Sequence, residues 1–430
     1  MTATIKDNAY EAVGFSTTAA ERALDAGDGI VRLAPAWVPR EFCTPGRRVR
    51  LHPDDYYPFG KDRGGVDERW LSSAIRADNG PLTGPFEGLS LVVDPDGGPL
   101  LPFDELVAHH GAGLIGDRLW GAYGKWPMYS KFFDNQQALP FHFHHRDEDA
   151  AKVGKLGKPE AYYFSPHMNN HLGDHPVSFF GFQPDVTREQ FRERLVRFAE
   201  GGDNRVTDLS VGYRIQLGTG FDVPVGVLHA PASICTYEPQ AASDVFVMCE
   251  SWSNNREVPA GLMWKDVPEV SIGDFDYIID LLDWDANADP SFGVNRFMAP
   301  YETRRSLEAG EDVIERWVVY KSVAASGKEL AVRPGATVTV TDSDAYGLIV
   351  VQGFGSIGSH DVEAATVIRF GELSNDEFYV SAEAARAGVT VVNRSSVQAL
   401  VMLKHYGPGN EELAADPPPS WYTSLDGVGW

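Results

Sequence analysis

Most of the chain consists of short segments in which apolar and polar residues alternate, and Gly, Pro, Asn or Asp residues separate these segments. Alternation with a period of two is typical of strands that bury one face, and frequent turn residues between such segments are typical of antiparallel sheets. Clear examples are residues 211–217, 336–342, 347–353 and 389–395. The pattern predicts a mainly β protein built as a sandwich or a barrel.

Helical periodicity is scarce along the chain. The strongest candidate helix begins at Thr187, because Phe191, Leu195 and Phe198 form one apolar stripe. Thr187 and the Gln three residues later also have the spacing of a capping box. A second helix is expected over residues 103–111. We therefore predict few helices, with at least one inserted among strands.

A change in composition between about residues 285 and 315 divides the chain into two parts. A loop-like stretch is followed there by a highly charged segment, and a new series of alternating segments begins after it. We expect an N-terminal unit over residues 1–310, with a helical insertion at about 165–205, and a C-terminal unit over residues 311–430. The Pro-rich, polar end of the second unit is expected to be a tail that is draped on the surface or poorly ordered.

Composition narrows the class of protein. The net charge is −24, from 37 Lys and Arg against 61 Asp and Glu, which argues against nucleic acid or an anionic membrane as partner. No apolar run approaches the roughly 18–20 residues of a membrane span, and the first forty residues contain no apolar signal core. Cys43, Cys235 and Cys249 form neither a disulfide framework nor a Cys-x-x-Cys metal site. We expect a cytoplasmic globular protein.

Two histidine motifs indicate a metal site. His142 and His144 stand two residues apart, so in a strand both side chains project to one face and can reach one ion. Further along, Pro224, Gly226 and His229 form a Pro-x-Gly-x-x-His pattern, in which a tight turn delivers a third imidazole from the next strand. This order of motifs is typical of a cupin barrel. The alternative is that the histidines are hydrogen-bonded core residues.

A carboxylate is expected as the fourth ligand, and two glutamates are candidates. Glu148 lies four residues after His144, which is the usual cupin spacing, but it belongs to the acidic run Asp147-Glu148-Asp149. Such runs commonly favour a helix N-terminus. Glu160 ends the Gly-Lys-Pro-Glu segment further on. We assign Glu160 to the metal and keep Glu148 as the alternative.

These motifs, taken in order, resemble those of the zinc-dependent class I mannose phosphate isomerases. That family has a Gln-x-His pair, a Gly-Lys-Thr-Glu segment, a Pro-x-Gly-x-x-His-Ala strand and a Glu-x-Gln-x-x-Ser-Asp segment. The matching positions here are His142 to His144, Gly157 to Glu160, His229 with Ala230, and Glu238 to Asp244. The resemblance covers about residues 59–280 and implies a bicupin fold made of double-stranded β-helix barrels, with a helical insertion in the first. It also implies one divalent metal, zinc before manganese or iron, held by His142, His144, Glu160 and His229.

Two departures from the family pattern concern the metal and the substrate. His142 replaces the family Gln, which gives a set of three His and one Glu that is more typical of other cupins. Met248 stands where the family has an arginine after the Ser-Asp pair. The resemblance implies a small sugar or sugar phosphate as substrate, and the missing arginine leaves an unphosphorylated or otherwise modified sugar as the alternative.

The resemblance implies isomerisation between an aldose and a ketose, which needs a residue that moves a proton near the metal. Lys158 stands two residues before Glu160 and is expected on the same strand face. Glu238 and Asp244 are the carboxylate candidates. The plainer alternatives are a solvated lysine for Lys158, a structural hydrogen bond for Glu238 and a turn cap for Asp244.

The C-terminal unit also has alternating segments that resemble a cupin, but it contains His360 and His405 without a His-x-His pair. We expect it to bind no metal and to serve packing, closure of the pocket or contacts between copies in a homo-oligomer. Two other functions stay open. Three His and one Glu also suit iron or manganese, and hence a dioxygenase or oxidase. A sugar-binding protein that has lost catalysis together with the arginine is the second.

Overall fold

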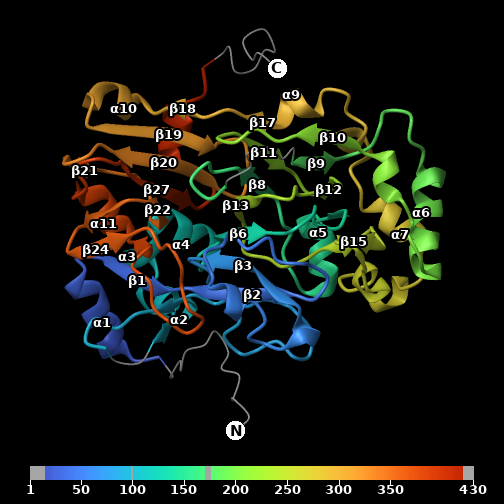
Figure 1. Cartoon of the computed structure of the whole chain (residues 1–430), viewed down its shortest axis with the longest axis horizontal. Coiled ribbons are helices and arrows are strands. Elements are labelled where there is room, and N and C mark those ends of the chain that lie inside the picture. Colours follow the sequence, from blue (N-terminus) through green and yellow to red (C-terminus); the bar gives the residue numbers. More distant parts are fainter. Residues whose placement is uncertain (1–14, 98–99, 170–175, 420–430) are drawn as a thin grey trace.

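A computed structural model describes residues 15–97, 100–169 and 176–419 of the chain. Its strands are arranged in four larger sheets and one two-stranded ribbon, and the helices lie around them (Figure 1). The prediction of a mainly β chain is confirmed. In the described part of the chain, no helix has the length and apolar character needed to cross a membrane.

Two sheets made mainly from the first 300 residues face each other. The larger has the order β17-β11-β8-β13-β6-β3-β2 and the smaller the order β10-β9-β12-β7-β14. The seven strands of the larger sheet are, in that order, Phe297–Met298, Gly220–Val223, Glu160–Tyr163, Cys235–Ala241, Met128–Asp134, Gly65–Leu71 and Ala36–Arg40. The five strands of the smaller sheet are Val211–Arg214, Val177–Phe180, His229–Ala230, His142–Phe143 and Val247–Met248.

The remaining strands form a second pair of sheets. The larger has the order β18-β19-β20-β27-β22-β25-β1-β4-β5, and the smaller β21-β26-β23-β24. The nine strands are Tyr301–Glu302, Val313–Val319, Ser326–Val332, Leu400–Tyr406, Tyr346–Gln352, Glu377–Val380, Ile30–Ala34, Leu91–Val92 and Leu101–Pro102. The four strands are Thr337–Val340, Val389–Asn393, Phe354–Ile357 and His360–Glu363, and a separate ribbon pairs β15 (Trp252–Ser253) with β16 (Arg256–Glu257). Strand β1 pairs with β25, so the N-terminal part of the chain contributes to the sheet of the C-terminal part.

The two large sheets pack on each other through an apolar layer. Trp37, Phe132 and Tyr237 of the seven-stranded sheet share one buried cluster with Trp317 and Leu403 of the nine-stranded sheet. Because side chains alternate along a strand, the opposite face of the seven-stranded sheet points away from this layer. That opposite face meets the five-stranded sheet, and the polar groups described below lie there.

The two helices expected from the sequence are present. Helix α6 (Arg188–Glu200) begins after Thr187, whose hydroxyl accepts a hydrogen bond from the Gln190 amide in a complete capping box. Its apolar stripe packs in one cluster with Phe141 and Ala230, on the outer face of the five-stranded sheet. Figure 1 shows α6 beside α7 at one side of the molecule. The second expected helix is α2 (Phe103–His110). The other helices are α1 Thr17–Ala26, α3 Ala112–Ile115, α4 Asp117–Tyr123, α5 Asp147–Ala150, α7 Phe275–Asp280, α8 Trp284–Asn287, α9 Phe292–Arg296, α10 Arg304–Ala309, α11 Ala382–Ala387 and α12 Glu411–Ala415.

The expected surface tail contains an ordered element that the sequence pattern did not predict. Helix α12 lies within it, and the Glu412 carboxylate accepts a 2.8 Å hydrogen bond from Nζ of the buried Lys328. This buried contact explains why the segment is held on the C-terminal sheets. Residues 420–430 of the tail and residues 170–175 of the expected insertion lie outside the described part of the chain.

Candidate metal centre and catalytic cleft

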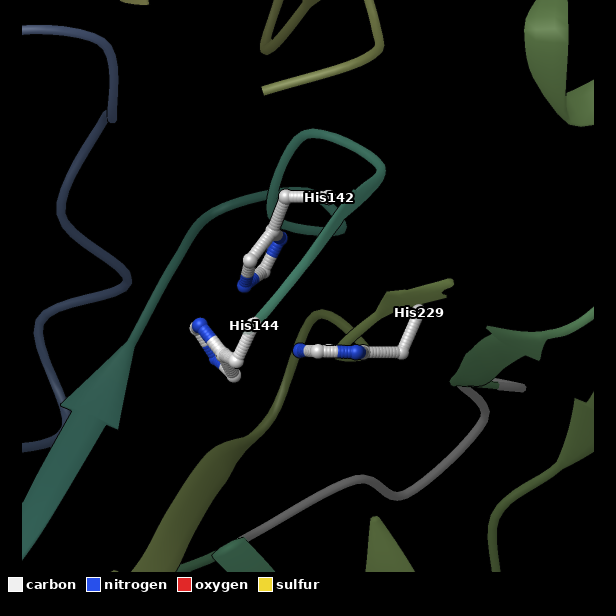
Figure 2. Close-up of side chains that lie close together, drawn as sticks. All are labelled: His142, His144 and His229. Atoms are coloured by element: carbon white, nitrogen blue, oxygen red, sulfur yellow. The ribbon is translucent and has the colours of Figure 1, made fainter. Parts of the chain in front are cut away.

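Three histidine side chains converge on the inner face of the five-stranded sheet (Figure 2). His142 on β7 and His229 on β12 are direct partners in the antiparallel pairing, and their ring centroids are 4.2 Å apart. His144 follows two residues after His142, with its ring 5.1 Å from that of His142 and 5.0 Å from that of His229. One ring nitrogen from each lies within 4.8 Å of those of the other two. The structure thus brings together the three imidazoles that the spacing in the sequence indicated.

Backbone carbonyls orient all three rings in the same way. Nδ1 of His142 lies 2.6 Å from the Pro140 oxygen, Nδ1 of His144 lies 2.7 Å from the Val245 oxygen, and Nδ1 of His229 lies 2.9 Å from the Val227 oxygen. A carbonyl only accepts hydrogen bonds, so each Nδ1 carries a proton, and in the neutral imidazole Nε2 then carries a lone pair. This second hydrogen bond is the device that fixes the tautomer of metal-binding histidines.

Glu160, on β8 of the opposite sheet, places its carboxylate against these lone pairs. Its Oε2 lies 2.9 Å from Nε2 of His144, and its Oε1 lies 3.2 Å from Nε2 of His229. Lone pairs of two acceptors repel each other, and a cation between them removes that repulsion. Three imidazole nitrogens and one carboxylate oxygen are a donor set that suits zinc, and also iron or manganese. The residues present therefore fit a divalent metal.

The alternative carboxylate lies elsewhere. Glu148 is exposed in the first turn of helix α5, together with Asp147 and Asp149. Acidic residues in the first turn interact favourably with the helix dipole, which accounts for this acidic run. Glu160, in contrast, is buried against the imidazoles. Of the two candidates, the structure brings only Glu160 to the histidines.

Burial favours the neutral forms of His142 and His144. It lowers the pKa of His142 well below its usual range, with the neighbouring His229 adding to the effect. Burial and the Lys158 ammonium together lower the pKa of His144 to about 3. Burial alone would raise the pKa of Glu160, but Lys158 and His144 hold it well below its usual range. Neutral imidazoles and an ionised carboxylate are the forms that bind metal.

Two of the predicted catalytic residues lie beside this centre. Nζ of Lys158 is 2.9 Å from Oε2 of Glu160 and 3.0 Å from Nε2 of His144. Glu238 comes from β13, and its Oε1 is 3.7 Å from Nζ of Lys158 and 3.2 Å from Nζ of Lys131. Burial raises the pKa of Glu238 well above its usual range, and the charge of Glu160 raises it further. Lys158 thus links Glu238 to the Glu160 and His144 side chains.

Asp244, the third predicted catalytic residue, forms an ion pair with Arg40. Both carboxylate oxygens of Asp244 accept hydrogen bonds from the guanidinium of Arg40, at 3.0 and 3.1 Å, and Oδ2 also accepts one from the Asp78 amide at 3.0 Å. Burial alone would raise the pKa of Asp244, but Arg40 holds it far below its usual range. The structure therefore places Asp244 in an ion pair at the side of the cleft.

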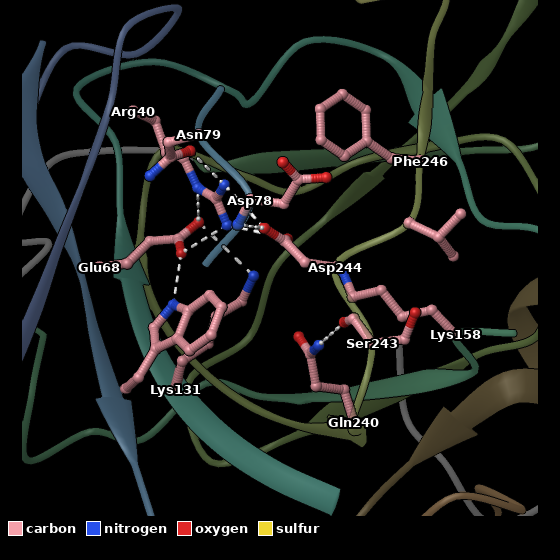
Figure 3. A network of polar contacts seen from close by, with 12 residues as sticks. Arg40, Glu68, Asp78, Asn79, Lys131, Lys158, Gln240, Ser243, Asp244 and Phe246 are labelled. Atoms are coloured by element: carbon pink, nitrogen blue, oxygen red, sulfur yellow. Dashed lines mark hydrogen bonds and ion pairs between the residues drawn. The ribbon is translucent and has the colours of Figure 1, made fainter. Parts of the chain in front are cut away.

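Sequence reasoning missed Arg40, Glu68 and Lys131, which belong to the same network (Figure 3). Nε and Nη2 of Arg40 each donate to Glu68 at 3.2 Å, and Nζ of Lys131 lies 3.5 Å from Glu68. They come from β2, β3 and β6, which are buried along their whole lengths. A charged residue inside a buried strand was the available signal, because buried charges need partners.

Two neighbouring cavities share Phe42 and Phe246 in their walls. The inner one, about 30 Å³, is lined by His142, His144 and Lys158, together with the polar network and Met248. Met248 pairs with His142 across β14 and β7 and is buried. The outer cavity, about 140 Å³, is lined by residues that include Glu41, Asp62, Arg63, Asp78 and Lys265. We call the two cavities together the cleft.

Comparison with known proteins supports the fold. No family model matches the sequence, and no curated protein matches it. Among solved structures, a protein from Archaeoglobus fulgidus assigned as a mannosephosphate isomerase has a TM-score of 0.57 at 15% identity, over 88% of this chain and 97% of that chain. A phosphomannose isomerase variant from Salmonella typhimurium has a TM-score of 0.60 at 10% identity, over 88% and 100%. A zinc-bound mannose 6-phosphate isomerase has a TM-score of 0.59 at 10% identity, over the same shares.

The chain therefore has the mainly β fold of the phosphomannose isomerases. At these identities the likeness establishes the fold. The division of each half into a closed cupin barrel stays a prediction.

Proposed function

We propose that the protein is a metal-dependent aldose–ketose isomerase, with one divalent metal, zinc in the first place, held by His142, His144, Glu160 and His229. The observation that carries the proposal is the convergence of three imidazole side chains and a buried carboxylate beside a lysine and a second carboxylate. The fold shared with zinc-bound mannose 6-phosphate isomerase supports it.

The chemistry divides between the metal and the chain. When bound, a divalent cation supplies Lewis-acid stabilisation of the negative charge that develops on the sugar oxygens. Oε1 of Glu238 is then the base that takes the proton from C2 of the aldose and returns it to C1. The Lys158 ammonium, 3.7 Å from Glu238, gives a proton to O1 of the aldose as that carbonyl becomes a hydroxyl, and it regains one from the O2 hydroxyl as that becomes the ketose carbonyl. Asp244 is a positioning residue, because its carboxylate is occupied by Arg40.

Elemental analysis of protein purified without added metal tests the centre, and a sugar screen by NMR in D₂O tests the reaction. We expect about one zinc or manganese per chain, and deuterium at C2 of the aldose produced from a ketose. His144→Ala should lose both, whereas His52→Ala, a change of a partly exposed histidine outside the cleft, should keep both. Absence of stoichiometric metal from the unaltered protein would contradict the proposal.

The composition of the ligand set also favours a second candidate function. Three histidines and one glutamate also form a site for iron, and therefore for a dioxygenase or oxidase. Iron in the purified protein, together with oxygen consumption on addition of substrate, would favour that function. Thermal stabilisation by sugars without turnover would instead indicate a sugar-binding protein that has lost catalysis.

We also propose two units, residues 1–310 and 311–430, with the second binding no metal. In that second unit Glu315, Asp342 and Glu412 come close enough together for a metal. However, Nζ of Lys328 lies within 3.3 Å of all three carboxylates, and Nζ of Lys404 contacts Glu315 and Asp342. These lysines already supply the positive charge, so a structural role in packing is proposed for the cluster.

A further inference from the structure

We infer that the cleft takes an unphosphorylated sugar, and that Asp244 and Asp78 set this specificity by neutralising Arg40 and Lys265, the cations that would otherwise bind a phosphate group. This inference rests on the proposed function and adds the substrate class to it. It follows from the pairing of the charged groups that line the cleft.

In the inner cavity, Arg40 has no donor left for a substrate. Its Nε donates to Glu68, its Nη1 donates to Asn79 at 2.7 Å and to Asp244 at 3.1 Å, and its Nη2 donates to Glu68 and Asp244. These contacts account for all five N–H groups of a guanidinium. A phosphate could bind this arginine only by displacing Asn79 or a buried carboxylate.

The two lysines of the inner cavity are paired as well. Lys131 lies between Glu68 and Glu238, at 3.5 and 3.2 Å. Lys158 lies 2.9 Å from Glu160 at the metal centre. Each cation that lines the inner cavity therefore faces at least one carboxylate, and Met248 and Phe246 add apolar surface.

The cations that line the outer cavity also lie beside carboxylates. Nζ of Lys265 donates to the Asp78 carbonyl at 2.7 Å and lies 3.4 Å from the Asp78 carboxylate. It also lies 4.3 Å from the centroid of the Phe246 ring. Arg63 donates to both oxygens of Glu87, at 2.6 and 2.7 Å. Glu41, which lines this cavity too, adds further negative charge.

A phosphate group and a hydroxyl group meet these surroundings differently. A phosphate oxygen only accepts hydrogen bonds and carries charge, so it is repelled by carboxylates and needs unpaired N–H donors. A sugar hydroxyl is neutral and both donates and accepts, so it can bond to a carboxylate and its lysine partner at once. A cleft in which cations and carboxylates alternate therefore favours hydroxyl groups over phosphate.

The test compares matched neutral and phosphorylated sugars on the zinc-loaded full chain. The kcat/KM values are measured for D-mannose and D-glucose beside D-mannose 6-phosphate and D-glucose 6-phosphate. We expect the neutral member of a pair to be favoured at least tenfold. Preference for the phosphate ester would overturn the inference while leaving the isomerase function intact.

A binding measurement keeps the inference separate from the proposed function. If no sugar is isomerised, the proposed function fails, and calorimetry with D-mannitol and D-mannitol 1-phosphate still decides the substrate class. Tighter binding of the neutral polyol supports the inference. Tighter binding of its phosphate, or no binding of either, overturns it.

The specificity residues are tested by Asp78→Asn, which removes the charge of the carboxylate 3.4 Å from Lys265 and keeps the size of the side chain. We expect the ratio of kcat/KM for phosphorylated over neutral sugar to rise at least threefold. Asp361→Asn is the matched control, because it breaks the exposed ion pair with Arg394 on the four-stranded sheet. The control should leave the ratio unchanged, and an unchanged ratio in Asp78→Asn would contradict the assigned role.

Discussion

The guanidinium of Arg40 and the carboxylate of Asp244 form two hydrogen bonds, of 3.0 and 3.1 Å, although 204 residues separate them in the chain. Both side chains are almost completely buried. The pair ties β2 to the segment between β13 and β14 at the side of the cleft. We therefore interpret Asp244 as a residue that stabilises the wall of the cleft through its ion pair with Arg40.

Asp244→Ala should therefore destabilise the protein by about 3–5 kcal/mol, because it leaves Arg40 buried with one partner fewer. Urea unfolding followed by tryptophan fluorescence measures the change. Asp361→Ala, which removes an exposed partner of Arg394, should change the stability by less than about 1 kcal/mol. A loss of kcat in Asp244→Asn with unaltered stability would instead indicate that Asp244 is the base.

The identity of the carboxylate ligand is open to a direct comparison. Glu160→Gln should weaken metal binding by more than the roughly 10–100-fold that loss of an outer partner costs, since it removes a ligand charge from between His144 and His229. Competition with a chelator measures the affinity. Glu148→Gln, in exposed helix α5, should bind metal like the unaltered protein. The reverse order of the two variants would assign Glu148 to the metal.

Proton transfer is assigned to Glu238, and its removal should separate chemistry from metal binding. Glu238→Gln should lower kcat by about 10²–10⁴-fold, the usual contribution of a general base. Metal content should stay at one per chain, because the imidazoles and Glu160 are unchanged. Lys158→Met is expected to lower kcat as well. If Glu238→Gln loses the metal or keeps full activity, another group carries the proton.

Stability should depend on pH through a buried pair that joins the two large sheets. Glu377 on β25 lies 3.2 Å from Nη2 of Arg69 on β3, and burial, partly offset by Arg69, raises the pKa of Glu377 to about 7. Below its ordinary pKa near 4.5 the contribution of this group to stability is fully present, and it is lost as the pH rises through 7. The raised pKa of Glu377 corresponds to a contribution of up to roughly 3 kcal/mol to the free energy of unfolding.

Glu377→Gln should remove that part of the pH dependence. Urea unfolding of both proteins between pH 4 and 8 gives the difference in unfolding free energy. We expect the unaltered protein to lose stability relative to the variant as the pH rises from about 4.5 to above 7. A difference that stays constant over this range would show that the Glu377 carboxyl has an ordinary pKa.

Local patterns in the sequence determined much of the architecture and half of the site. Period-two alternation predicted the strands, and the capping box with its apolar stripe predicted helix α6, because both follow from neighbours within a few residues. The same holds for the metal ligands. A strand places His142 and His144 near each other, and Gly226 makes the turn before His229 with a φ of +73°, which favours glycine.

Tertiary structure alone decided the remainder. Arg40, Glu68 and Lys131 meet Asp244 because β2, β3 and β6 lie side by side in one sheet, and no spacing in the chain indicates that pairing. The same applies to β1, which joins the sheet of the C-terminal strands, and to α12, whose Glu412 reaches Lys328. Hydrogen bonds between strands that are distant in the chain depend on which strand edges meet after folding. A local sequence pattern therefore does not predict them. The charges that surround the metal centre, and with them the proposed choice of substrate, come from that long-range pairing.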